Sequence, residues 1–143
     1  MALTITYGNH WKYHLALKDV DYDDDTFMLA LMASGFTFDP DTHHNWANAS
    51  ASEYADAAHG YAAGGAEVTT TVTEDDGDNR AEIALSNKAW TATDEDIGPT
   101  PGAILYDDTQ ADKVIVCYLN FDGNKTAAAS ANFEVNDVVL TVS

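Results

Sequence analysis

Turn-forming residues interrupt this sequence at short, regular intervals, and they limit the chain to many short elements. Gly, Asn and Asp gather at positions 8–9, 64–65 and 75–79, between runs that are rich in Val, Ile, Thr and aromatic side chains. Such spacing is typical of sandwiches and barrels. We therefore expect one mainly β domain over residues 1–143: an antiparallel β-sandwich or barrel-like fold of about eight short strands with one or two short helices.

Residues 26–33 are apolar on both faces of an extended chain, because Phe27 and Leu29 alternate with Met28 and Ala30. This pattern favours a central strand that is covered on both sides, and a short buried helix also fits it. Residues 66–73 with 80–90, and 103–106 with 113–121, are predicted to form hairpins. The remaining expected strands are residues 2–7, 131–135 and 138–142.

Two short helices are predicted. Apolar and polar side chains alternate at helical spacing over residues 10–17, after Asn9. The second helix is expected over residues 51–59, because Ser50 and Glu53 have the spacing of a capping box. Gly60 suits the left-handed position that follows a helix.

The segment 39–65 is long, rich in Ala and partly helical in this reading. Long excursions in small domains are usually functional or disordered, and exposed aromatic side chains anchor protein interfaces. A loop folded over one end of the sandwich is the alternative interpretation. Residues 1–7 are expected to form an N-terminal arm or an edge strand. The predicted interface residues are Leu3, Ile5, Tyr7, Trp46, Tyr54 and Tyr61.

The charge of the chain restricts its partners. Twenty-four Asp and Glu residues oppose six Lys and Arg residues, so the formal net charge is −18. Nucleic acids and anionic lipids repel such a surface, and we expect it to bind neither nucleic acid nor a membrane. One hypothesis is that the protein works in concentrated salt, in a halophile or its virus, where screening relieves self-repulsion. A mesophilic acidic surface that maintains solubility is the other.

Few residues suggest chemistry. The carboxylates of Asp21, Asp23 and Asp25 suggest a calcium-binding loop. An EF-hand loop that starts at Asp19 or at Asp21 would lack the required glycine and the final glutamate. We therefore predict a solvated acidic loop, with an irregular cation site as the weaker alternative. Cys117 is expected to be a buried core residue. His10 and His14 share one helical face, and surface or packing roles are expected for them.

Enzyme motifs are also missing from the sequence. It contains no phosphate-binding loop, no nucleophile elbow and no dinucleotide fingerprint. We expect no catalytic residue, no cofactor and no enzymatic activity. The chain also starts without a leader pattern, so synthesis in a host cytoplasm is expected.

Several short motifs, taken in order, resemble those of a family of small structural proteins from tailed viruses. The resemblance covers nearly the whole chain, although each motif is short. The motifs are residues 7–9, 15–17, 26–34, 38–43, 60–65, 90–93, 102–108 and 116–122, with Trp46, Ser50 and Glu53. This chain departs from the family by its stronger acidity and by Ala where Thr or Val is usual, which fits a halophilic host.

The resemblance implies a head decoration protein or another minor virion component without catalytic residues. The expected function is therefore a capsid decoration, or cement, protein that bridges major capsid protein subunits on the outside of the virion. A trimer is the expected homo-oligomer, since decoration sites follow local symmetry. The alternatives are a tail or baseplate component, and a host-attachment module that binds carbohydrate through Trp and Tyr.

Overall fold

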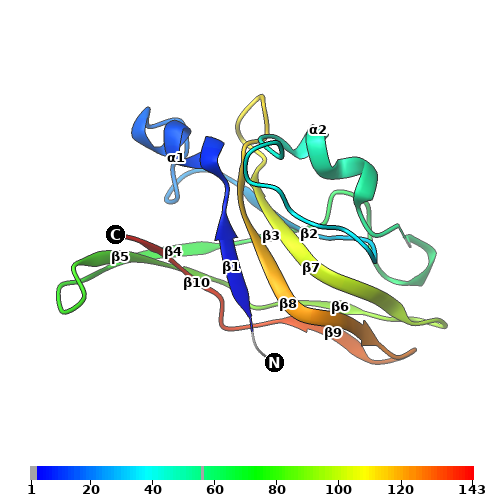
Figure 1. Ribbon diagram of the computed structural model, residues 1–143. Coiled ribbons are helices and arrows are strands. Elements are labelled where there is room, and N and C mark those ends of the chain that lie inside the picture. The colour runs from blue at the N-terminus through cyan, green and yellow to red at the C-terminus, as the bar shows by residue number, and fades with distance from the viewer. Residues whose placement is uncertain (1–2, 56) are drawn as a thin grey trace.

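The computed structural model describes residues 3–55 and 57–143, which fold into ten strands and two short α-helices (Figure 1). A five-stranded antiparallel sheet has the order β1-β8-β7-β2-β3. Its strands are β1 (Thr4–Tyr7), β2 (Phe27–Leu31), β3 (Ala66–Val68), β7 (Ile97–Asp107) and β8 (Ile115–Ala127). The long β7–β8 hairpin forms its centre.

The second layer consists of two smaller antiparallel sheets that run along one side of the large sheet (Figure 1). One has the order β10-β5-β4, and the other pairs β6 with β9. Their strands are β4 (Thr70–Asp75), β5 (Arg80–Leu85), β6 (Lys88–Thr91), β9 (Asn132–Val135) and β10 (Val139–Val142). Within the described residues the sheets do not close into a barrel, so the sandwich form of the predicted mainly β fold is confirmed.

The strand over residues 80–90 differs from the prediction, which had one continuous strand. The chain breaks after β5 because Asn87 turns away from the ladder and its side-chain oxygen accepts a hydrogen bond from the Asp137 N–H at 2.9 Å. The partner strands β9 and β10 are interrupted at the same level. β5 and β6 therefore belong to two small sheets that follow one another in the same layer.

Both faces of the central strand β2 are buried, as the sequence predicted. Phe27, Leu29 and Leu31 face the main core between the two layers. Ala30 faces a second apolar cluster on the outer side of the large sheet, where Trp46 also packs. The outer cluster lies beneath the segment 39–65.

One of the two predicted helices is present and the other is not. α1 spans Asn9–Ala16 and agrees closely with the expected helix. α2 spans Trp46–Ala49, followed by the 3₁₀ turns η1 (Ser50–Ser52) and η2 (Ala57–His59). The predicted helix over residues 51–59 is therefore wrong. None of the helices in the described ranges is long and apolar enough to cross a membrane.

Candidate protein-interaction surface

The outer edge of β1 is open. β1 is the last strand of the large sheet and pairs with β8 on one side, with Thr6 opposite Tyr118. On the other side, no strand in the described part of the chain pairs with it. The Gly8 N–H continues the ladder to the Val116 carbonyl at 3.0 Å. Because hydrogen bonding alternates along antiparallel strands, the N–H and C=O groups of Ile5 and Tyr7 point away from β8, toward this open edge.

Two small pockets flank this edge, one on each face of the sheet. The pocket on the inner face has a volume of about 200 Å³ and is lined by Leu3, Phe121, Lys125, Glu134, Val135 and Asn136. The pocket on the outer face, of about 190 Å³, is lined by Thr6, Phe36, Thr37, Phe38, Pro101, Tyr118 and Asn120. A strand added beside β1 would project successive side chains toward opposite faces. We call the open backbone of β1 and these two pockets the β1 edge surface.

The side chains of Leu3, Ile5 and Tyr7 pack inward against the main core. The Tyr7 hydroxyl accepts a hydrogen bond from the Thr141 N–H of β10 at 2.7 Å, and its ring stacks on Trp11 with 5.1 Å between centroids. Tyr7 therefore links the two layers of the sandwich. A partner could therefore contact the backbone edge of β1 and the pocket beside Leu3.

Two of the three predicted aromatic contact residues in segment 39–65 are buried. Tyr61 is 0% exposed and Trp46 is 9% exposed. The Trp46 ring stacks on Tyr106 with 4.7 Å between centroids and an interplanar angle of 8°. These rings attach the excursion to the outer face of the sheet, and they are not surfaces that another protein can reach. Their placement agrees better with the alternative interpretation, in which segment 39–65 is a loop folded over the sandwich, than with a contact surface.

Glu53 holds the excursion in place by a contact that the sequence pattern did not indicate. Its carboxylate accepts hydrogen bonds from the Tyr61 hydroxyl and from the Gly64 N–H, each at 2.7 Å. The Tyr61 hydroxyl in turn accepts the Leu31 N–H of β2 at 2.9 Å. Burial raises the pKa of Glu53 above its ordinary value. Glu53 is thus a bridge to Tyr61. At the start of α2 it is the side-chain oxygen of Asn48 that accepts the Asn45 N–H, at 2.9 Å.

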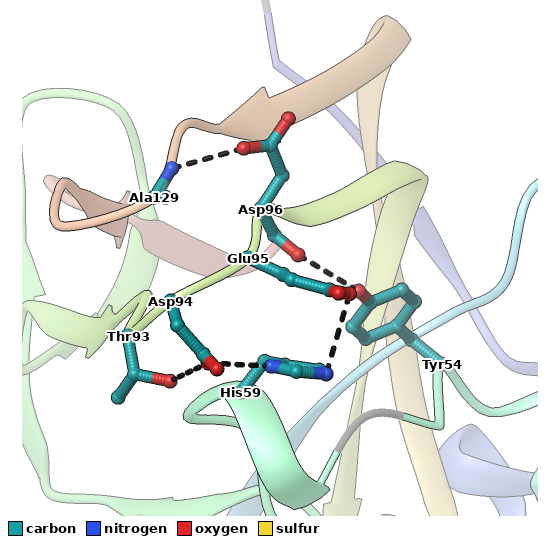
Figure 2. A network of polar contacts seen from close by, with 7 residues as sticks. All are labelled: Tyr54, His59, Thr93, Asp94, Glu95, Asp96 and Ala129. Carbon is teal, nitrogen blue, oxygen red and sulfur yellow. Dashed lines mark hydrogen bonds and ion pairs between the residues drawn. The ribbon is translucent and has the colours of Figure 1, made fainter.

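Tyr54 is half-buried and borders an acidic network (Figure 2). His59 contacts Asp94 through Nδ1 at 2.8 Å and Glu95 through Nε2 at 3.3 Å. The carboxylate of Asp96 accepts the Ala129 N–H at 2.9 Å, and this network joins η2 to two loops of the second layer. The contact to His59 lowers the pKa of Asp94. The network fixes one end of the excursion to the sandwich.

The three candidate calcium ligands lie in a turn whose carboxylates accept hydrogen bonds from backbone N–H groups of the same turn. The Asp21 carboxylate accepts the Asp23 N–H at 2.9 Å, and the Asp25 carboxylate accepts the Asp21 N–H at 3.0 Å. Among residues 3–55 and 57–143 there is no group of three or more His, Cys, Asp or Glu side chains arranged to hold a metal ion. The structure therefore does not bring Asp21, Asp23 and Asp25 together as ligands.

Asp25 instead lies near Asp107, a residue that no sequence motif indicated. Asp107 lies at the end of β7 and is 0% exposed. One of its carboxyl oxygens accepts the Thr109 N–H at 3.0 Å. Burial, and then the neighbouring carboxyl of Asp25, raise the pKa of Asp107 to about 8. The free energy of unfolding therefore depends on the protonation of Asp107 and varies with pH.

Cys117 lies in β8 and is 0% exposed, as expected of a core residue. Burial raises the pKa of its thiol, which keeps the thiol protonated and unreactive.

Comparison with known proteins finds no matching family model, no matching curated protein and no matching solved structure.

Proposed function

We propose that this chain is a capsid decoration protein of a tailed virus, which binds the outside of the head and bridges subunits of the major capsid protein. The observation that supports this proposal most is the β1 edge surface. An open strand edge with a pocket on each face is the arrangement that strand addition uses, since backbone hydrogen bonds supply affinity and the pockets select side chains.

The partner in this proposal is an extended segment of the major capsid protein. It would align beside β1 and bond to the outward N–H and C=O groups of Ile5 and Tyr7. Alternate side chains would enter the pocket beside Leu3 and the pocket beside Thr6. Because the decoration protein binds only the assembled, folded shell, it would stabilise that shell by mass action.

Aromatic side chains on the outer face make that pocket a suitable anchor site. Phe38 stacks on Tyr118 with 5.7 Å between centroids, and Phe36 meets the same ring edge-on at 5.5 Å. Phe36 and Phe38 are only partly buried in the free chain. A partner side chain in this pocket would cover apolar surface, which contributes about 25 cal/mol per Å².

The rest of the surface suits an outward-facing role in this proposal. A net charge of −18 keeps the exposed faces solvated and prevents copies from associating without specificity. Copies at local symmetry positions of the head would form trimers. The protein would reside in the virion after its synthesis in the host cytoplasm, without a cofactor or a catalytic role.

The burial of the tryptophans favours a protein partner over a carbohydrate. Trp11, Trp46 and Trp90 are 4%, 9% and 6% exposed, so their indole rings lie in the core. A glycan platform built from them would require the core to open. The tail or baseplate alternative would use the same β1 edge surface, and the copy number in particles separates it from decoration.

Binding to purified heads of undecorated major capsid protein tests this proposal. Thr6→Lys places a charge beside the edge and its outer pocket, and edge lysines block strand addition. Thr71→Lys is the matched control, because Thr71 is also an exposed threonine on an outer strand, β4, and the charge change is identical.

Co-sedimentation with heads should give saturable binding of the wild-type chain. We expect Thr6→Lys to weaken that binding by about tenfold or more, or about 1.4 kcal/mol, and Thr71→Lys to leave it unchanged. Equal binding of both variants and the wild type would exclude the β1 edge as the contact. No binding of the wild type would reject a decoration role.

A further inference from the structure

Two histidines on α1 direct ring nitrogens at each other. His10 and His14 are four residues apart and therefore lie on the same helical face. Their Nε2 atoms are 2.9 Å apart, and the ring centroids are 4.4 Å apart. One Nε2 therefore donates a hydrogen bond and the other accepts it through its lone pair, because two N–H groups cannot face each other at this distance.

Asp19 holds the ring of His14 in this orientation. Its carboxylate lies 2.9 Å from Nδ1 of His14, and its backbone N–H donates to the His14 carbonyl at 2.9 Å. A carboxylate at Nδ1 keeps the proton there and leaves Nε2 as the acceptor. This carboxylate–histidine pair is the arrangement that orients histidines which bind metal ions.

We propose that His10 and His14 bind one divalent transition-metal ion through their Nε2 atoms, with Asp19 as the positioning residue. A metal–nitrogen bond is about 2.1 Å long, so two adjacent ligands on one ion stand about 3 Å apart. The observed separation of 2.9 Å is close to this spacing. Ion binding would replace the hydrogen bond between the two rings, and the Nε2 proton of His10 would move to its Nδ1 or to water. Imidazole ligands favour Zn²⁺, Cu²⁺ and Ni²⁺ over Mg²⁺ and Ca²⁺.

The described side chains around the two histidines offer no third ligand to the ion. The side chain of His14 is 14% exposed, so the site lies near the surface. His44 stacks on the ring of His10 with 4.7 Å between centroids, while its own Nε2 is engaged by the Asp41 carbonyl at 2.8 Å. No cluster of three ligating side chains exists in the described ranges, so water completes the coordination. The strong negative charge of the chain attracts the cation.

Titration calorimetry with Zn²⁺ tests the site, on chain that carries no polyhistidine tag and has been treated with a chelator. The wild-type chain should bind one ion. His10→Ala and His14→Ala should each weaken binding by about tenfold or more, and Asp19→Asn by about tenfold, as second-sphere changes do. His59→Gln is the matched control, because His59 belongs to the separate network of Figure 2, and it should leave binding unchanged.

Circular dichroism shows which variants fold, and NMR of the wild-type chain provides a readout that needs no variant. Zn²⁺ should shift the imidazole signals of His10 and His14 more than those of His43 and His59. The proposal is overturned if the wild-type chain binds no Zn²⁺ at millimolar concentration, or if folded His10→Ala and His14→Ala bind it normally. Shifts confined to other histidines would overturn it as well.

Discussion

Replacing Asp107 with Asn should remove a large part of the pH dependence of stability between acidic and alkaline conditions. The pKa of Asp107 is raised from 3.8 to about 8, so the folded chain keeps a proton that the unfolded chain has already lost in this interval. Stability therefore falls as the pH rises through that range. At about 1.4 kcal/mol per pH unit, the interval corresponds to at most about 6 kcal/mol.

Asn keeps the acceptor for the Thr109 N–H and stays neutral at every pH. Urea unfolding of both proteins in molar KCl from pH 4 to pH 9 measures the effect, since salt screens the other carboxylates. The advantage of Asp107→Asn over the wild type should be near zero at pH 4 and should grow by several kcal/mol by pH 9. Asp112→Asn removes an exposed charge from the same hairpin connection and should show little such growth. An advantage of Asp107→Asn that is constant with pH would refute the reasoning.

Three further predictions concern the excursion and the charge. Tyr61→Phe should lower the free energy of unfolding by about 1–3 kcal/mol, because it leaves the half-buried Glu53 carboxylate without that donor, whereas Tyr13→Phe at an exposed ring should not. Gly65→Ala should destabilise far more than Gly35→Ala in denaturant titrations. Both glycines have positive φ, but a Cβ at Gly65 would lie 2.1 Å from a β2 carbonyl. The melting temperature should rise from low to molar salt as the charge of −18 is screened, and a flat profile would contradict self-repulsion.

The sequence predicts most local pairings, but the predicted strand over residues 66–73 is wrong in its first part, because residues 66–68 form β3 and pair with β2. The β4–β5 hairpin follows from a Thr- and Val-rich run before the turn around Gly77 and from a run with Ile83 and Leu85 at alternate positions after it. β2 follows from its two apolar faces, because a strand without a polar face is buried on both sides. These features depend on neighbouring residues, and a single sequence contains that information.

The extent of β7 and the break between β5 and β6 were not predictable in the same way. Pro99 and Pro101 lie outside the strands that the sequence predicts, yet they belong to β7, whose register to β8 shifts at three points, two of them beside these prolines. Prolines are tolerated in sheets at such irregularities. The break near Asn87 depends on Asp137, which is distant in sequence. Long-range partners of this kind leave no local signal.

Some features of the candidate site also follow from the sequence, and others do not. Residues 1–7 are predicted to form an arm or an edge strand. β1 (Thr4–Tyr7) occupies the edge of the large sheet, and residues 1–2 lie outside the described part of the chain. The pocket beside Thr6 depends on Phe36 and Phe38 lying against Tyr118, and no sequence spacing indicates that contact. Trp46 and Tyr61 have the composition of an interface but cover the outer face of the sheet instead. Composition alone does not distinguish an aromatic that binds a partner from one that packs on its own fold.

Quantitative mass spectrometry of purified virus particles tests the central claim most directly. If this chain binds the head through its open strand edge, mature particles should contain it in hundreds of copies, in a simple ratio to the major capsid protein. A few copies or tens of copies would assign it to the tail. Its absence from purified particles would contradict the account.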